Sequence, residues 1–346
     1  IFVRLIYKLE MAYIKAISYY LPKKKFSNEE FFLNFPEISD KNKENLRRIG
    51  VNERRIVDSI HTSSDIAIAA ANALFNEHKI VRKEVDFLLF CSLELDYPMP
   101  STACVIQEKL QLSKDCGALD FNLGCSGYIY GLSLAKGLIE TRSAKNVLLL
   151  TASTLTKKIH KKDKSARFIF GDGAAATLIS EGNKKGIGKF IFGTDGKKSE
   201  KIIVKDGGAR NPISESSFID FSDEFGNTTN NASFYMDGTS IFIFGLKTVP
   251  EAIQKLLEKI DEKIEQIDLF IFHQANLYLI EKIGQKLKIP ENKIFNFMKN
   301  CGNTVSSTIP IALYEAIKAG KAKPGQKIIL VGFGVGLSWA ATIIQL

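Results

Sequence analysis

Hydrophobic and polar residues follow two different periods along this chain. Short apolar runs rich in branched and aromatic side chains, such as VDFLLFCSLE (85–94) and AKNVLLLTAS (144–153), are typical of buried strands. The stretches between them, TACVIQEKLQL (102–112) and GYIYGLSLAKGLIET (127–141), have the spacing of helices that bury one face. This alternation predicts an α/β protein in which helices cover a sheet.

The second half of the chain repeats this order of elements. EVDFLLF reappears as QIDLFIF and AKNVLLLTAS as GQKIILVGFG, in both cases about 180 residues later. In the same order, CGALDFNLG (116–124) corresponds to NKIFNFMKNCGN (292–303), and FGDGAAATLIS (170–180) corresponds to GLSWAATIIQL (336–346) as a closing strand. We therefore expect an internal duplication, with two similar α/β halves packed together.

The duplication divides the chain into an N-terminal half, 11–185, and a C-terminal half, 186–346. The junction is expected in 182–231, a segment rich in Gly, Ser, Lys and Asp that predicts an irregular excursion. Residues 1–10 precede the strand-like segment that starts at Met11, and we interpret them as an upstream extension. Charged residues interrupt this apolar start and no small-residue cleavage site follows, so a signal peptide is not indicated.

Composition indicates a soluble globular protein with a large core. Of the 346 residues, 45% are hydrophobic and 25% charged. No run of about 18 apolar residues predicts a membrane span. The five cysteines form an odd set without a CxxC pair, so neither a disulfide framework nor a zinc site is indicated and we expect reduced thiols in the cytoplasm (Cys91, Cys104, Cys116, Cys125 and Cys301).

The net charge of +9 narrows the class of partner only slightly. Lysines are spread along the chain, and only TKKIHKKDKSAR (156–167) is dense. Two interpretations of this run stay open, a solvated loop or a docking surface for an anionic ligand or carrier. No nucleic-acid partner is predicted.

Cys125 lies in DFNLGCSGYIYG, after a strand-like run and at the start of a predicted helix. Unpaired N–H groups and the helix dipole favour an anion at this position, so we expect a lowered thiol pKa and partial thiolate at neutral pH. Gly124 and Gly127 would let substrate and backbone approach closely. The alternative is a small buried cysteine packed in a tight turn.

Two further residues follow β-runs in the second half. Asn303 occupies the matching strand-to-helix turn and can donate a side-chain hydrogen bond, although Asn is also a common helix N-cap. His273 ends IDLFIF, where α/β sheets present ligand-binding groups. Cys301 competes as a nucleophile, but it precedes the turn and is expected to point into the core. Cys, His and Asn together predict covalent catalysis with two donors to an oxyanion, although a cysteine protease uses the same residue types.

Five motifs carry a resemblance to a known family. NLGCSG, FGDGAAA, HQAN, GNTVSSTIP and GFGVGLSW resemble, in order and spacing, the β-ketoacyl-acyl-carrier-protein synthase III family of thiolase-fold condensing enzymes. The likeness covers the chain from Met11 onward. It implies a homodimer of five-layered αβαβα subunits, built from two duplicated halves, that uses acyl-CoA as a substrate and needs no cofactor or metal.

The resemblance also implies a mechanism carried by Cys125, His273 and Asn303. The cysteine takes an acyl group from a coenzyme A thioester. His273 and Asn303 bind the thioester carbonyl of malonyl-acyl carrier protein, whose decarboxylation gives the carbanion that attacks the acyl-cysteine. Two neutral donors in a dry site suit this enolate, because they stabilise it without protonating the carbanion.

The glycine-rich GFGVG motif is expected to complete the site. The backbone N–H groups of Cys125 and Val335 would stabilise the tetrahedral intermediate at the acyl-cysteine, and Gly334 and Gly336 would contact substrate. A dinucleotide site is rejected because an apolar strand, rather than a helix, follows GFGVG. Asp172 of FGDGAAA is structural in the family and is not expected to be catalytic.

Coenzyme A contacts follow from the same resemblance. Arg48 matches an arginine that contacts coenzyme A, and Lys164 matches the basic residue that precedes FGDG. Glu44 stands where the family has a tryptophan that stacks on adenine. Met99 lies in the segment that crosses the dimer interface, where it would either close the acyl pocket of the other subunit or simply pack in the interface.

The carrier-docking site departs from the family as well. Tyr278 replaces the docking arginine, which leaves Lys282 and Lys286 on that helix. Because the entrance is altered, a specialised condensing enzyme or acyltransferase of secondary-metabolite or surface-glycan biosynthesis, with another donor or acceptor, stays open as an alternative. So do acyl transfer to oxygen or nitrogen with His273 as general base, and a binding subunit without catalysis.

Overall fold

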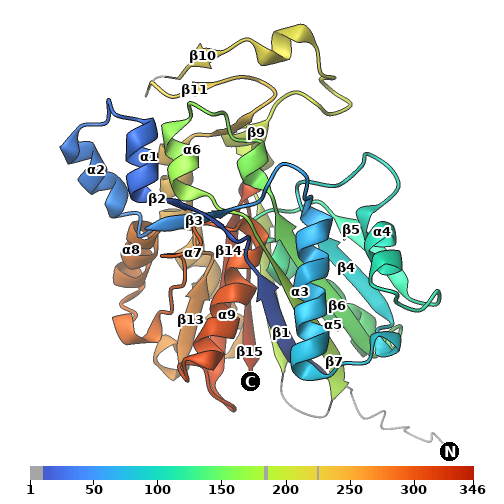
Figure 1. Cartoon of the computed structure of the whole chain (residues 1–346). Coiled ribbons are helices and arrows are strands. Elements are labelled where there is room, and N and C mark those ends of the chain that lie inside the picture. The colour runs from blue at the N-terminus through green and yellow to red at the C-terminus, as the bar shows by residue number, and fades with distance from the viewer. Residues whose placement is uncertain (1–10, 183–185, 224–225) are drawn as a thin grey trace, which may run out of the picture.

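The computed structural model describes residues 11–182, 186–223 and 226–346 (Figure 1). The interpretation of residues 1–10 as an upstream extension therefore lies outside the described residues. The expected boundary between the halves falls at 185, which is also outside them, so the division of the chain stays a prediction. Within the described ranges, no helix combines the length and apolar character needed to cross a membrane.

The first sheet has five strands in the order β1-β7-β6-β4-β5. Strands β4, β5 and β6 are parallel, and β7 lies antiparallel to both β1 and β6. The central strand β6 is almost entirely buried because helices cover both faces of the sheet, which is why its sequence is a continuous apolar run. The bounds are β1 (Met11–Tyr20), β4 (Phe87–Cys91), β5 (Gly117–Phe121), β6 (Asn146–Ser153) and β7 (Gly173–Gly182).

The second sheet has the order β13-β14-β15-β8, which repeats the order of the first sheet with one strand fewer. The pair β13 and β14 is parallel, whereas β15 is antiparallel to β14 and β8. The corresponding strands β7 and β15 end their halves in sequence, and each lies inside its sheet rather than at an edge. The bounds are β8 (Ile187–Thr194), β13 (Leu269–Phe272), β14 (Lys327–Gly334) and β15 (Ser338–Gln345).

The strand that is missing from the second sheet is the expected counterpart of β5. Residues 292–303 were matched with 116–124, but in the structure Ile294 makes only an isolated bridge with Phe270. Three residues later, the backbone N–H of Phe297 donates to the side-chain oxygen of Gln274 at 2.8 Å, so a side chain replaces the neighbouring strand. The expectation of matching elements is therefore wrong here.

Six helices and the two sheets form five layers (Figure 1). Helices α3 and α4 pack on the outer face of the first sheet, and α7 and α8 cover the outer face of the second. Helices α5 and α9 lie between the sheets. Each of these three helical layers packs on a buried apolar cluster of its own. The expected αβαβα order is confirmed. The bounds are α3 (Ser63–His78), α4 (Thr102–Lys109), α5 (Gly127–Glu140), α7 (Gly238–Ile260), α8 (Leu277–Leu287) and α9 (Thr308–Lys318).

Two smaller units lie on the layers. One is formed by β2 (Lys24–Ser27), α1 (Asn28–Asn34), α2 (Asp40–Arg47) and β3 (Glu53–Ile56), next to α6 (Lys164–Ile169). The other, called the excursion below, contains β9 (Ile202–Val204), β10 (Phe221–Ser222), β11 (Thr228–Thr229) and β12 (Phe234–Met236). The irregular segment predicted over 182–231 starts later than expected, because Ile187–Thr194 form β8 of the second sheet, and it continues beyond residue 231. In Figure 1, β10 and β11 form an arm above α6 and β9.

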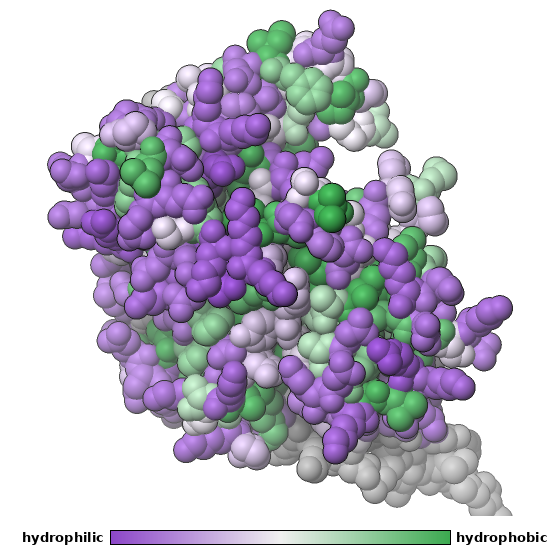
Figure 2. Space-filling model, viewed as in Figure 1, coloured by the Kyte–Doolittle hydropathy of each residue, from purple (hydrophilic) through white to green (hydrophobic). Residues whose placement is uncertain are grey.

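The surface of these two units differs. In the face shown in Figure 2, hydrophilic residues dominate over α1, α2 and α6, whereas hydrophobic residues are visible on the excursion. Phe218 and Ile219 of the excursion are 59% and 67% exposed. The excursion nevertheless contributes to the interior, because β9 and β12 pair with each other and supply buried apolar residues, Ile202 and Phe234.

Candidate active site

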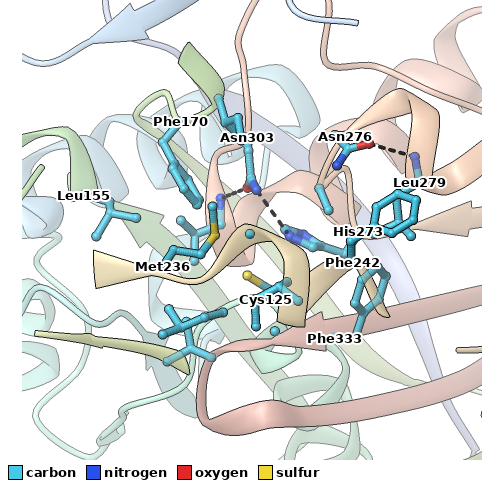
Figure 3. Close-up of a pocket in the computed structure, with 18 of the residues that line it drawn as sticks. Cys125, Leu155, Phe170, Met236, Phe242, His273, Asn276, Leu279, Asn303 and Phe333 are labelled. Atoms are coloured by element: carbon cyan, nitrogen blue, oxygen red, sulfur yellow. Dashed lines mark hydrogen bonds between the residues drawn. The ribbon is translucent and has the colours of Figure 1, made fainter. Parts of the chain in front are cut away.

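Cys125, His273 and Asn303 line the same cavity (Figure 3). In sequence, Cys125 lies 148 residues before His273 and 178 residues before Asn303. All three side chains are buried, with exposed fractions of 5%, 2% and 3%. Most of the wall is apolar and comes from both halves and from the excursion (Leu155, Phe170, Ile202, Phe234, Met236 and Phe333).

Cys125 lies in the turn that follows β5, next to Ser126, the N-cap residue of α5. The backbone N–H groups of Val335 and Cys125 itself donate hydrogen bonds toward the sulfur. Burial nevertheless raises the pKa of the Cys125 thiol to about 12, and these hydrogen bonds only partly oppose it. This direction is opposite to the expected lowering of the thiol pKa, because loss of water outweighs the two backbone hydrogen bonds.

Glycines of β14 allow the Cys125 turn to approach the second sheet. A Cβ atom on Gly332 would lie 2.7 Å from the carbonyl oxygen of Cys125, and one on Gly334 would lie 2.7 Å from its Sγ. The hydroxyls of Ser126 and Ser338 form a hydrogen bond of 2.7 Å across the same contact. The nucleophile candidate is thus positioned by the other half of the chain.

His273 follows β13, and its backbone N–H donates to the carbonyl of Val331 at 2.7 Å. Its Nδ1 lies 2.7 Å from Oγ1 of Thr308, and its ring contacts Phe333 edge-to-face. Burial lowers the pKa of His273 to about 3, so the imidazole is neutral at physiological pH. Thr308, at the start of α9, was missed in the sequence because its role depends on a contact between separate elements.

Asn303 lies between both halves of the molecule. Its side-chain oxygen accepts a hydrogen bond from the N–H of Val305 at 2.9 Å, which orients the amide so that Nδ2 faces His273 Nε2 at 3.4 Å. Its backbone N–H donates to Ile169, and its carbonyl accepts from Gly171. The amide is therefore held as a donor that faces the cavity.

Two residues that the sequence placed outside the chemistry lie outside the cavity. Cys301 is buried and its Sγ lies near the carbonyls of Phe297 and Gly302. Asp172 is also buried, and it accepts hydrogen bonds from the N–H of Val57 and from Thr156, which joins three segments of the first half. Neither residue is among those that line the cavity.

The expected substrate contacts are only partly brought together. Gly334 and Val335 line the cavity, whereas Gly336 does not. Arg48 is exposed at the end of α2, and Lys164 forms an ion pair with Glu37 at 3.0 Å. Both lie outside the cavity lining.

The expected interface and docking residues are on the surface. Met99 is 83% exposed. On α8, Lys282 lies over the ring of Tyr278, and Lys286 donates to the carbonyl of Leu246. Among the described residues, no group of three or more His, Cys, Asp or Glu side chains is arranged to hold a metal ion.

Comparison with known proteins places this chain in a family. The description 3-oxoacyl-[acyl-carrier-protein (ACP)] synthase III matches residues 119–196, and that of the synthase III C terminal matches residues 257–346. A β-ketoacyl-[acyl-carrier-protein] synthase III of Clostridium perfringens is 36% identical over 329 residues, which cover 94% of this chain and 97% of the relative. The chain belongs to the 3-oxoacyl-[acyl-carrier-protein] synthase III family.

Solved structures agree with this assignment. A crystal structure of a 3-oxoacyl-(acyl-carrier-protein) synthase III has a TM-score of 0.94 and 42% identity, and the match covers 97% of this chain and 100% of the other. The 3-oxoacyl-(acyl-carrier protein) synthase of Burkholderia xenovorans LB400 has a TM-score of 0.88 and 32% identity, over 97% and 94% of the two chains. The thiolase-like fold expected for a synthase III is confirmed, and the protein is a condensing acyltransferase that forms C–C bonds.

Proposed function

We propose that this synthase III condenses an acyl group from an acyl-CoA with malonyl-acyl carrier protein, which gives 3-oxoacyl-acyl carrier protein, CO₂ and coenzyme A. The observation that carries the proposal is the single apolar cavity that Cys125, His273 and Asn303 share. Family membership favours this reaction over the specialised condensing enzyme or acyltransferase considered from the sequence.

Cys125 acts first, as the nucleophile. Its sulfur attacks the thioester carbonyl while the N–H groups of Val335 and Cys125 hold the developing oxyanion. The S–C bond to coenzyme A then breaks, and the thiol proton of Cys125 ends on the departing coenzyme A sulfur. Because a thiol with a raised pKa is neutral before attack, no charge is left in the apolar cavity between reactions.

His273 and Asn303 act second, on the malonyl thioester. Nε2 of His273 and Nδ2 of Asn303 lie 3.4 Å apart, so one carbonyl oxygen can accept from both. Loss of CO₂ leaves an enolate on that oxygen, and its carbon attacks the acyl-cysteine and expels the Cys125 thiolate, which takes up a proton. Thr308 positions His273 through the 2.7 Å contact between its Oγ1 and Nδ1, while its hydroxyl donates to the carbonyl of Val305 at 3.0 Å. Donation from His273 to the enolate requires the ring proton to be on Nε2.

The partners follow from the same proposal. Acyl carrier protein docks near Lys282 and Lys286, and Arg48 and Lys164 contact coenzyme A at the entrance. A second copy of the chain forms a homodimer in which Met99 closes the acyl pocket of its partner. The reaction takes place in the cytoplasm and needs no cofactor beyond its substrates.

The test is a mass measurement of the intact protein after incubation with acetyl-CoA and longer acyl-CoAs. We expect an acyl adduct on the Cys125 peptide, and CO₂ together with a 3-oxoacyl product after malonyl-acyl carrier protein is added. Cys301→Ala serves as a matched control that keeps the adduct. Absence of an adduct with every donor overturns the proposal, and an acylated enzyme that transfers to oxygen or nitrogen without malonyl dependence supports the non-decarboxylating alternative.

A further inference from the structure

A second cavity adjoins the one that contains Cys125. Its lining includes four residues that also line the first cavity, so the two spaces adjoin along these apolar side chains (Leu155, Ile202, Phe234 and Val335). The second cavity differs in character, because Glu94, Asn122, Lys158 and Asp206 add polar and charged groups to it. We call it the side cavity.

Glu94 stands out among these polar residues. Its Oε2 accepts a hydrogen bond from the backbone N–H of Thr154 at 3.2 Å. Its Oε1 is shielded from solvent and has no hydrogen-bond partner within the described parts of the chain. A buried acceptor without a partner is costly, so an oxygen in this position favours a ligand that supplies a donor.

The electrostatic surroundings of Glu94 agree with a ligand-binding role. Burial, and then the like charge of Asp172, raise the pKa of the Glu94 carboxyl to about 7, against contributions from Thr154, Ser153 and Lys158 that lower it. The charge of Glu94 also raises the pKa of Cys125 slightly. Glu94 is therefore electrostatically connected to the nucleophile, although it does not line the first cavity.

The direction of the acyl group connects the two cavities, and this step rests on the proposed function. In Figure 3, Leu155 lies on one side of Cys125, and Phe242, Leu279 and Asn276 lie on the other, toward α7 and α8. The carrier arm and the acyl group leave a thioester carbonyl in different directions. If the arm enters past α8, where the carrier is proposed to dock, the acyl group extends past Leu155 and toward the side cavity.

We propose that Glu94 determines acyl specificity, by accepting a hydrogen bond from a hydroxyl or amino group at the far end of an acyl chain on Cys125. An acyl chain that ends in a methyl group leaves Oε1 unpartnered, whereas a chain that ends in a donor satisfies it. A site built to hydrogen-bond a substrate group discriminates against the analogue that lacks it. The side cavity therefore selects acyl groups by the chemistry of their ends as well as by their length.

The experiment measures the rate of adduct formation on Cys125 with three matched series of acyl-CoAs of increasing length: unsubstituted, with a terminal hydroxyl and with a terminal amino group. In the wild-type protein, one length of a donor-ended series is expected to react about tenfold faster than its unsubstituted match. Glu94→Leu abolishes this preference. Glu94→Gln keeps the preference for chains that end in a hydroxyl and loses the preference for chains that end in an amino group. This variant therefore distinguishes recognition of a neutral hydrogen-bond donor from recognition of a cation.

Asp96→Asn is the matched control. Asp96 lies two residues away in the same loop and also has a buried carboxylate oxygen without a partner, but it lines neither cavity. Its variant keeps the preference of the wild type. The proposal is overturned if wild-type protein shows no preference at any length, or if Asp96→Asn loses the preference equally. Failure of the proposed function gives a different result, because then no acyl-CoA of any series acylates Cys125.

Discussion

The turn that carries Cys125 and the turn that carries Asn303 have the same place in their halves but are held by different means. The Cys125 turn leads into α5, and the Asn303 turn leads through one short helical turn into α9. Both helices belong to the middle layer, and each turn is held by the opposite half. Asn303 is fixed by two backbone hydrogen bonds to the first half, with Ile169 and Gly171. Cys125 is fixed by close packing on glycines of β14 and by one pair of hydroxyls.

This difference concerns which substitutions each turn tolerates. Backbone hydrogen bonds do not depend on the side chains of the bonded residues, so the Asn303 turn is less dependent on the identity of its neighbours. Gly171 must nevertheless lack a side chain, because a Cβ there would meet the carbonyl oxygen of Cys301. The Cys125 turn depends on the absence of side chains in the other half, at Gly332 and Gly334. The position of the nucleophile is therefore encoded about 200 residues away from it, in a strand of the other sheet.

The largest effect is expected from removal of the thiol. Cys125→Ala leaves the turn intact but removes the only group that forms the acyl-enzyme, so condensation falls by more than about 10⁴-fold and no adduct forms. Intact-protein mass and product formation measure both effects. Cys301→Ala, a buried cysteine outside the cavity, keeps the adduct, and an adduct on Cys125→Ala would assign the nucleophile to another residue.

Removal of the Asn303 amide separates the two turns functionally. Asn303→Ala eliminates one of two donors to the enolate, so condensation falls by about 10²- to 10³-fold while acylation of Cys125 stays within severalfold of wild type. Single-turnover acylation and steady-state condensation are measured side by side. Equal losses in both steps would show that Asn303 also serves the first step.

Two glycine substitutions test how each turn is held. Gly332→Ala brings a Cβ to 2.7 Å from the carbonyl oxygen of Cys125, and Gly171→Ala brings one into overlap with the carbonyl oxygen of Cys301, beside Asn303. Each variant is expected to lose about 1–3 kcal/mol of unfolding free energy, measured by denaturant titration. Gly332→Ala slows acylation, whereas Gly171→Ala slows condensation and spares acylation. The same loss profile in both variants would contradict independent support of the turns.

Lowering the pH is expected to reduce the free energy of unfolding through His273, next to Asn303, but not through Cys125. The pKa of His273, next to Asn303, is lowered to about 3 in the folded protein, so between pH 3 and 6.5 the unfolded state binds the extra proton and stability falls as pH falls. From pH 7 to pH 5, the wild type loses about 2 kcal/mol more than His273→Gln. Denaturant titrations at both pH values measure this difference. Cys125 stays neutral throughout this range, so equal acid sensitivity of the two proteins would refute the assignment.

The smallest effect concerns the hydroxyl pair on the Cys125 turn. Ser126→Ala removes a buried hydrogen bond to Ser338 and is expected to cost about 1 kcal/mol of unfolding free energy, with activity retained. Ser338→Ala costs more, because its hydroxyl also donates to the carbonyl of Val335 at 2.9 Å. The double variant costs less than the sum, because both single variants break the same bond. Additive losses in the double-mutant cycle would show that the pair does not couple the halves.

Sequence patterns predicted much of this arrangement because local signals are strong where strands are fully buried. Apolar runs predict β4, β6 and β14, and helical spacing predicts α4 and α5. The missing counterpart of β5 was not predictable, because the Gln274 side chain that replaces a strand belongs to another element. The raised pKa of Cys125 was equally out of reach, because it depends on how completely the two halves and the excursion exclude water.

The pairing of β8 with β15 has a consequence for synthesis on the ribosome. β8 ends at Thr194 and its neighbour β15 begins at Ser338. At about 5–20 residues per second, roughly 7–30 s pass between the emergence of the two strands. During that time β8 is an unpaired edge that is prone to aggregation, and β14, which holds Cys125 in place, does not yet exist for most of it. The nascent chain therefore carries its reactive cysteine for many seconds before the cavity that restrains it can form.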